Sequence, residues 1–486
     1  MQKRQKDLLR AVVLDLRHTL AGNTAIGKQV RGDLDRELER LGVAPDGTLT
    51  PFDIVANPTT HERRARQVAE AELAGVLAAQ RAATRTELVE RAAYSWINRL
   101  LALRAMEARG LITETLHPNP DYDGQPEALY VLAATDPARA AAADRGWWKV
   151  IEDACAEQAA SLPGLFGADD PNTALRPSIA ALLHTVAVLG GGHLPGFRLE
   201  EFDAAFADPD AIGWAYQFYQ EEAKAQIYAK LKAGGKVTTR DEIAAATQLF
   251  TEPYMVQWLL QNSLGRSYHE AYPLSTLPDT WDYYIRPEIL DQPAVPTLAG
   301  LTVMDPCMGS GHFLREAFDM LVAMCRERQP ELTATEIANR VLSTHLHGID
   351  IDPRAAQLAA LTLYLRAWEL VREERQAQRQ TGAGTYHPPA MNLATTPSHL
   401  TTGALDRHLR RHPEDMVLKD LLEEIFAALE QADILGSLLK PEEHLDAGIN
   451  KLRRTHTQQM DSDPTAMKLR ARRLSELRYT SGSRDK

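Results

Sequence analysis

A glycine turn and an acidic residue in the second half of the chain have the types and spacing of a nucleotide-binding site. The stretch LTVMDPCMGSGHF (301–313) is a short apolar run that ends in Asp305 and leads through Gly309 and Gly311 into an apparent helix. Glycine accepts positive φ and lets a ligand approach the backbone, and a helix N-terminus offers free N–H groups and partial positive charge. The turn alone is weak evidence, because a tight strand–helix connection without a ligand has a similar sequence.

A second acidic stretch strengthens the nucleotide hypothesis. In HGIDIDPRAA (347–356), Asp350 and Asp352 follow another apolar run and precede a helix. An acid at the end of the second strand of an open α/β sheet is the expected partner of ribose hydroxyls, whereas Asp352 has the alternative role of capping the helix. Asp350 lies 45 residues after Asp305. In a dinucleotide site the corresponding acidic residue follows the glycine turn by about 20 residues. Residues 325–343 predict an added helix in between, and the longer spacing argues against a dinucleotide.

These stretches belong to an α/β region that follows a helical one. Residues 1–235 are rich in Ala, Leu, Glu and Arg at helical spacing, which predicts a mostly α-helical region. From about residue 236, short apolar runs alternate with helical segments, which is typical of βαβ units and a parallel sheet. The expected strands are 301–305, 344–351 and 390–396.

In the helical region, one apolar face is marked by Leu88, Ala92, Trp96, Leu100, Leu103 and Met106. Gly110 supplies a stop signal for this helix. Tyr94 and Trp96 could stack on nucleic-acid bases, but their spacing favours core packing. The segment AIGWAYQFYQEEAK (211–224) predicts a further helix, whose aromatic side chains are expected in the core.

The composition is that of an ordinary globular protein. The 486 residues are 44% hydrophobic and 25% charged, and no apolar run approaches the roughly 18 residues that span a membrane. The expected location is the cytoplasm. Three cysteines at irregular spacing predict neither a disulfide scaffold nor a metal site.

The net charge of −12 argues against a protein whose whole surface binds DNA. Residues 451–486 nevertheless contain ten Lys or Arg and only four Asp or Glu. This tail is either a solvated end or a segment that faces nucleic acid.

Three motifs carry a resemblance to a known family. DPCMGSGHF (305–313) resembles motif I of the amino-group DNA methyltransferases, and GIDIDP (348–353) resembles their motif II. The upstream segment QLFTEPYMVQWLLQNSLG (248–265) is similar to their motif X, which precedes motif I. Outside the motifs, RAAYSWINRLLALRAMEARG, IGWAYQFYQ and ADILGSLLKPEEHL are similar to phage-defence adenine methyltransferases of the BREX/Pgl and DISARM systems. The resemblance covers residues 80–445.

The resemblance implies S-adenosylmethionine as the cofactor. Asp305 and the backbone from Gly309 to Gly311 would lie near its methionine part, Asp350 would accept bonds from the ribose, and Ile351 would cover one face of the adenine. The implied cofactor contacts are Phe250, Thr251, Tyr254, Asp305, Pro306, Gly309, Ser310, Gly311, Phe313, Asp350 and Ile351. Of these, Phe250, Thr251 and Tyr254 would close the methionine side, but the last two have the alternative role of starting a helix. Cys307 is expected to be a small turn residue, not a nucleophile.

The family also has a [D/N/S]PP[Y/F] motif, which accepts bonds from the target amine and stacks on a flipped base. The one Pro-Pro pair in the sequence, Pro388–Pro389, lies between His387 and Ala390 and does not match. The family sheet order is 3-2-1-4-5, so the chain would end before strand four. We therefore expect an incomplete Rossmann-like methyltransferase domain without a catalytic residue of its own.

The expected organisation is a helical domain (1–235), the cofactor-binding half of a methyltransferase domain (236–445) and a basic tail (446–486). The expected partners are DNA, other phage-defence subunits, and a second polypeptide that carries the NPPY motif and the target-recognition domain. Three functions stay open at this point. The chain is one part of an adenine-N6 DNA methyltransferase, a non-catalytic cofactor-binding or scaffold subunit, or a methyltransferase for another substrate class.

Overall fold

The structure is a computed structural model, and it describes residues 1–25, 28–192, 194–236, 251–290, 297–379, 385–395 and 419. The expectations for Phe250, the tail and the strand end at residue 396 lie outside these residues. Residues 1–226 and 247–395 form one compact unit, in which the main hydrophobic core runs from Leu8 to Tyr386 and a small second cluster contains Leu129, Leu132 and Val150. The proposed domain boundaries at residues 235 and 445 stay predictions.

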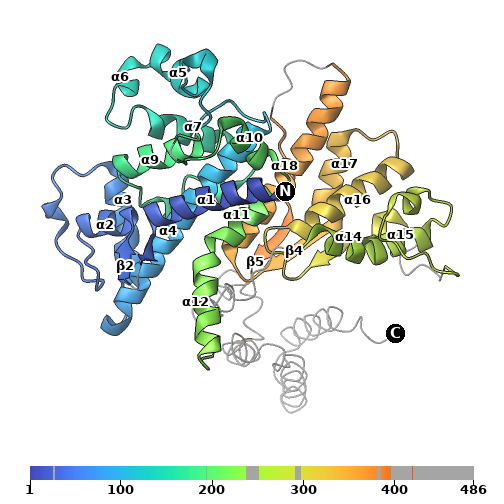
Figure 1. Ribbon diagram of the computed structural model, residues 1–486, viewed down its shortest axis with the longest axis horizontal. Coiled ribbons are helices and arrows are strands. Elements are labelled where there is room, and N and C mark those ends of the chain that lie inside the picture. The colour runs from blue at the N-terminus through green and yellow to red at the C-terminus, as the bar shows by residue number, and fades with distance from the viewer. Residues whose placement is uncertain are drawn as a thin grey trace, which may run out of the picture. The chain divides into compact units, whose positions relative to one another are not determined.

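The first part of the chain is helical, as predicted, apart from one short antiparallel strand pair that the sequence did not suggest (Figure 1). Its elements are α1 (Lys3–Leu20), β1 (Gly22–Ala25), β2 (Lys28–Arg31), α2 (Asp33–Arg40), α3 (Thr60–Leu73), α4 (Ala78–Ala108), α5 (Glu127–Thr135), α6 (Pro137–Ala140), α7 (Trp147–Gln158), α8 (Pro163–Phe166), α9 (Ile179–Leu189), α10 (Leu199–Ala207), α11 (Ala211–Tyr219) and α12 (Glu221–Lys232). Helix α1 packs on α4, α9, α10 and α11.

Helix α4 is the centre of this region. The predicted apolar face is buried, but residues 92–107 are buried on every side of the helix. Trp96 donates an indole hydrogen bond of 2.8 Å to the Leu175 carbonyl and contacts Trp148 edge to face, so its core role is confirmed. Tyr94 is also buried. A helix surrounded in this way contacts several neighbours at once, which a single-face pattern does not predict.

The second part contains a small parallel sheet. Its elements are α14 (Pro253–Asn262), α15 (Leu264–Ala271), β3 (Val303–Asp305), α16 (His312–Arg328), α17 (Ala334–Arg340), β4 (Leu346–Asp350), α18 (Pro353–Ala377) and β5 (Asn392–Thr395). A strand lies within each of the three predicted ranges, but each is shorter than predicted, and residues 344–345 belong to a helical turn. Helix α17 is the predicted added helix. A short π-helical turn, Val341–His345, joins α17 to β4.

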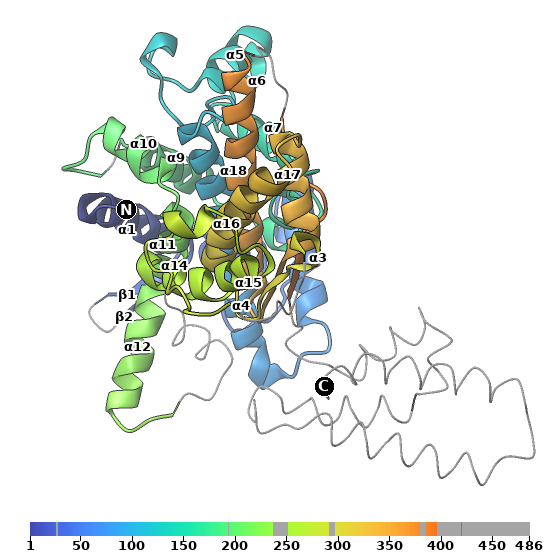
Figure 2. The same ribbon diagram turned by 90° about the vertical axis from the view of Figure 1, so that its right-hand side faces the viewer.

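The strand order is β3-β4-β5, and both pairs are parallel. The register places Asp305 opposite Gly348 and Asp350 opposite Thr395. Helices α16 and α18 pack against each other and against the sheet (Figures 1 and 2), and α18 also contacts α4 and α11. This arrangement is compatible with an α/β methyltransferase fold. Of the described strands, only β4 pairs with β3, and the β3 residue Met304 is 51% exposed.

Candidate cofactor site

The turn between β3 and α16 is tight because both of its glycines adopt positive φ. Gly309 has φ 53° and Gly311, which precedes α16, has φ 82°. The Met308 N–H donates a hydrogen bond of 3.0 Å to the Ile349 carbonyl. The Gly311 N–H donates a hydrogen bond of 2.8 Å to the Met308 carbonyl. A side chain at Gly311 would meet the Ala359 backbone at 2.9 Å, whereas the space beside Gly309 is open. The turn is therefore packed on one side and accessible on the other.

The structure brings Asp350 to this turn. Its Oδ2 accepts the Gly309 N–H at 2.8 Å, and its Oδ1 accepts the Asp352 N–H at 2.8 Å. A carboxylate has about four acceptor positions, so Asp350 keeps capacity for further donors such as ribose hydroxyls. The juxtaposition follows from parallel pairing, because the carboxyl ends of β3 and β4 lie at the same edge of the sheet.

Asp305 is the second carboxylate of the site. Burial raises the pKa of Asp305, and the negative charge of Asp350 raises it further. The hydrogen bond of 3.1 Å that Asp305 accepts from the Cys307 N–H lowers the pKa, but does not outweigh them. A cationic ligand group beside Asp305 would relieve this mutual repulsion. The site therefore has the electrostatic character expected for an ammonium or sulfonium ligand.

The other predicted cofactor contacts differ in how exposed their side chains are. Tyr254 is the second residue of α14, which packs on α16, whereas Thr251 precedes the N-cap residue Glu252 and lies outside the helix. Tyr254 is 50% exposed and Ile351 is 38% exposed, and both are available to cover a ligand. Ser310 is buried and Phe313 packs partly on the core, while Pro306 and Cys307 are exposed. The cofactor roles of these residues stay predictions.

Asp352 has the capping role that the sequence offered as an alternative. Its Oδ1 accepts the Arg354 N–H at 2.9 Å at the start of α18. The sequence did not suggest its other contacts, an ion pair with the Arg354 side chain at 2.8 Å and a hydrogen bond from the Tyr216 hydroxyl at 3.1 Å. Tyr216 is 136 residues away in the chain, and no spacing rule connects such positions.

A second contact between the helical region and the site was also missed. Asp210 lies 3.2 Å from the Arg315 guanidinium and 3.9 Å from His312 Nδ1, in the first turn of α16. Burial lowers the pKa of His312 to about 4, and Arg315 acts in the same direction. The Asp210 carboxylate opposes them, but the imidazole is neutral at pH 7.

We expect His312 to make the protein less stable as the pH falls from about 6.5 to about 4, whereas Glu107, whose pKa burial raises to about 7, acts in the opposite direction. In this range the unfolded chain binds a proton at His312 and the folded chain does not. A difference of this size corresponds to about 3 kcal/mol. Urea unfolding at several pH values should show a weaker acid dependence for His312→Asn than for the wild type. Parallel pH profiles would contradict the shifted pKa, because the other titrating groups are shared by both chains.

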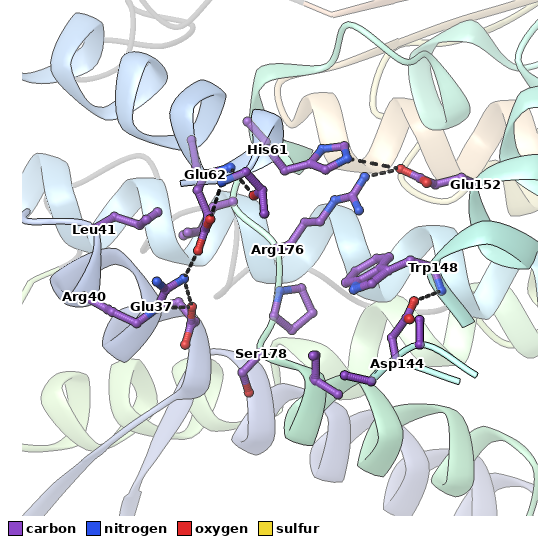
Figure 3. Close-up of a pocket in the computed structure, with 18 of the residues that line it drawn as sticks. Glu37, Arg40, Leu41, His61, Glu62, Asp144, Trp148, Glu152, Arg176 and Ser178 are labelled. Atoms are coloured by element: carbon purple, nitrogen blue, oxygen red, sulfur yellow. Dashed lines mark hydrogen bonds and ion pairs between the residues drawn. The ribbon is translucent and has the colours of Figure 1, made fainter. Parts of the chain in front are cut away.

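A cavity of about 690 Å³ lies away from this turn. It lies in the helical region between α2, α3, α7 and α9 (Figure 3). Each arginine on its wall is ion-paired with a neighbouring carboxylate: Arg40 with Glu37 and Glu62, Arg139 with Asp144, and Arg176 with Glu152. Arg176 also covers the Trp148 ring at 4.5 Å. The arginine charges are therefore neutralised by carboxylates within the wall, where His61 Nε2 also lies 3.8 Å from Glu152.

The glycine turn lies in a part of the chain that is similar to known methyltransferases. Residues 293–393 match the family described as MmeI, DNA-methyltransferase domain. Over 309 residues, 58% of this chain, the sequence is 34% identical to the adenine-specific methyltransferase BrxX of Escherichia coli O9:H4 (strain HS). This chain resembles the BREX/Pgl-type adenine-specific methyltransferases.

Two relatives named PglX extend this resemblance. The PglX protein of Lacticaseibacillus casei (strain Zhang) is 28% identical over 418 residues, 74% of this chain. The PglX protein of Streptomyces coelicolor is 29% identical over 143 residues, 26% of this chain. The matched parts are 24% of BrxX and 33% and 11% of the two PglX proteins, so the chain spans a third or less of these relatives.

In the described residues, no helix has the length and apolar character needed to cross a membrane. Nor do those residues contain a cluster of three or more His, Cys, Asp or Glu side chains arranged to hold a metal ion.

Proposed function

We propose that this chain is the S-adenosylmethionine-binding part of an adenine-N6 DNA methyltransferase in a BREX/Pgl-type phage-defence system. The observation that supports it best is the contact of the Asp350 carboxylate with the Gly309 N–H, which joins motif I to motif II. The methyltransferase relatives support the reaction class.

The residues present fit the proposed cofactor. Asp350 accepts hydrogen bonds from the ribose hydroxyls, and Ile351 and Tyr254 cover the apolar surface of the cofactor. The open space beside Gly309 lets the cofactor approach the protein backbone. Asp305 attracts the positively charged methionine part. When bound, S-adenosylmethionine supplies an activated methyl group. The chain's own residues bind and orient this group, and the [D/N/S]PP[Y/F] tetrapeptide that would accept the adenine amine does not occur in the sequence.

The partner proposal follows from the sheet. A central parallel strand has hydrogen-bonding groups on both edges, and buried groups of this kind need partners. In the described part of the sheet β3 pairs with β4 alone. We propose that the other edge of β3 pairs with a strand near the missing [D/N/S]PP[Y/F] motif, supplied by a second polypeptide. The proposed partners further include DNA and other defence subunits.

A non-catalytic role is the second candidate, and the lack of a [D/N/S]PP[Y/F] tetrapeptide in the sequence supports it and the first candidate equally. In this role the chain binds the cofactor within a defence complex without transferring the methyl group. Complementation with the missing motif separates the two candidates.

We expect Asp350→Ala to weaken S-adenosylmethionine binding by about 1–3 kcal/mol, because the ribose hydroxyls lose a charged acceptor. Isothermal titration calorimetry measures this loss. Asp319→Ala is a matched control, since Asp319 also lies in this unit and is ion-paired with Arg366 at 2.6 Å, but belongs to a later turn of α16.

Equal affinities of wild type and Asp350→Ala would remove Asp350 from the site. A wild-type chain that binds no S-adenosylmethionine, alone and together with a polypeptide carrying the missing motif, would overturn the proposal.

A further inference from the structure

Helix α11 connects the helical region to both helices that start at the candidate site. Asp210, immediately before α11, contacts Arg315 in the first turn of α16. Tyr216, in the middle of α11, donates its hydroxyl to Asp352 at the start of α18. The two helices begin at the glycine turn and just after Asp350, so α11 holds both sides of the site from outside the sheet.

The Tyr216 contact is part of a buried polar group. Asp352 and Tyr216 are 5% and 8% exposed. The Asp352 carboxylate accepts Arg354 Nε at 2.8 and 3.0 Å through its two oxygens, and the Arg354 guanidinium lies 5.0 Å from the centre of the Tyr94 ring. A buried carboxylate that loses one of its donors is destabilised or moves to find another.

A single hydrogen bond connects this buried polar group to Asp350, the predicted ribose acceptor. The backbone N–H of Asp352, the residue that Tyr216 holds, donates to Asp350 Oδ1 at 2.8 Å. The other oxygen of Asp350 accepts the Gly309 N–H. The orientation of Asp350 therefore depends on the glycine turn on one side and on the position of Asp352 on the other.

We propose that Tyr216 is a positioning residue for the adenosine end of the cofactor site. Its hydroxyl fixes Asp352, and the Asp352 N–H fixes the rotamer in which Asp350 meets the ribose. This inference rests on the proposed function, because it takes Asp350 as the ribose acceptor. It assigns a role in cofactor binding to a residue of the helical region.

The test is a pair of tyrosine variants on the same helix. Tyr216→Phe keeps the ring and removes the bond to Asp352. Tyr219→Phe is the matched control, because Tyr219 is also buried in α11 but donates its hydroxyl to Glu90, at 3.2 Å, in place of Asp352. S-adenosylhomocysteine is the calorimetric ligand, since it carries the same adenosine and does not react.

We expect Tyr216→Phe to weaken S-adenosylhomocysteine binding about three- to tenfold, as part of a hydrogen bond to a charged group is lost. Tyr219→Phe should leave the affinity within about twofold of the wild type. Thermal unfolding of both variants reports their general effect on stability.

A double-mutant cycle distinguishes positioning from a structural defect. If Tyr216 acts through Asp350, Tyr216→Phe should not weaken binding further in an Asp350→Ala background. Additive losses would overturn the inference, and so would equal affinities of Tyr216→Phe and wild type. A wild-type chain without affinity for either ligand, alone and together with a polypeptide carrying the missing motif, would overturn the proposed cofactor and this inference with it. Binding that is insensitive to Tyr216→Phe overturns only the inference.

Discussion

We expect the 486-residue chain on its own to transfer no methyl groups to adenine in DNA. The reason is chemical: an exocyclic amine needs an acceptor for its hydrogen bonds and an aromatic ring to hold the flipped base. The [D/N/S]PP[Y/F] motif that we expect to supply both does not occur in the sequence. Transfer of a labelled methyl group from S-adenosylmethionine to mixed genomic DNA measures the activity.

Co-expression with a polypeptide that carries the [D/N/S]PP[Y/F] motif should restore adenine methylation. The same polypeptide with its two prolines changed to alanine is the matched control, since it can still pair with β3. Methylation by the chain alone would show that its own residues supply the acceptor. Cofactor binding with no activity in the complex would favour the non-catalytic role.

We expect Gly311→Ala to lower the free energy of unfolding by about 2–4 kcal/mol and to abolish cofactor binding. Two costs add. At φ 82° a side chain is strained, by about 1–2 kcal/mol. The new Cβ would also lie 2.9 Å from the Ala359 Cα. Backbone cannot move aside as a flexible side chain can, so the turn and α18 must separate.

Gly309→Ala provides the matched control for this prediction. Gly309 also has positive φ, at 53°, but a Cβ added to it would meet no atom within 4 Å. Only the backbone cost of about 1–2 kcal/mol is expected. Urea unfolding of both variants measures the difference. Equal losses would show that the close approach of the turn to α18 contributes little to stability.

The sequence alone was sufficient for the strands and for the turn between them. Short apolar runs predicted β3, β4 and β5, and their alternation with helical segments predicted the parallel arrangement. The sequence also predicted that Asp350 ends the second strand, and its contact with Gly309 follows from the parallel pairing. These features depend on residues close in the chain and on the rules of parallel sheets, which a sequence reflects directly.

Some features of the helical region required the tertiary structure. The apolar period of α4 predicted one buried face, but packing from several directions buries the residues between positions 92 and 107 on all sides. The strand pair β1–β2 was not predicted, because its two segments, GNTA and KQVR, contain no apolar run. The strands of the parallel sheet were predicted from such runs.

The sequence by itself determined the glycine turn, the acid at the end of the second strand and the resemblance to adenine-specific methyltransferases. Only the tertiary structure decided which side chains hold these parts in place. Tyr216 meets Asp352, and Asp210 meets Arg315, across more than 100 residues of chain. A buried carboxylate requires hydrogen-bond donors, but the sequence around it does not say which ones. The position of α11, which packs against α18 and begins beside α16, selects them.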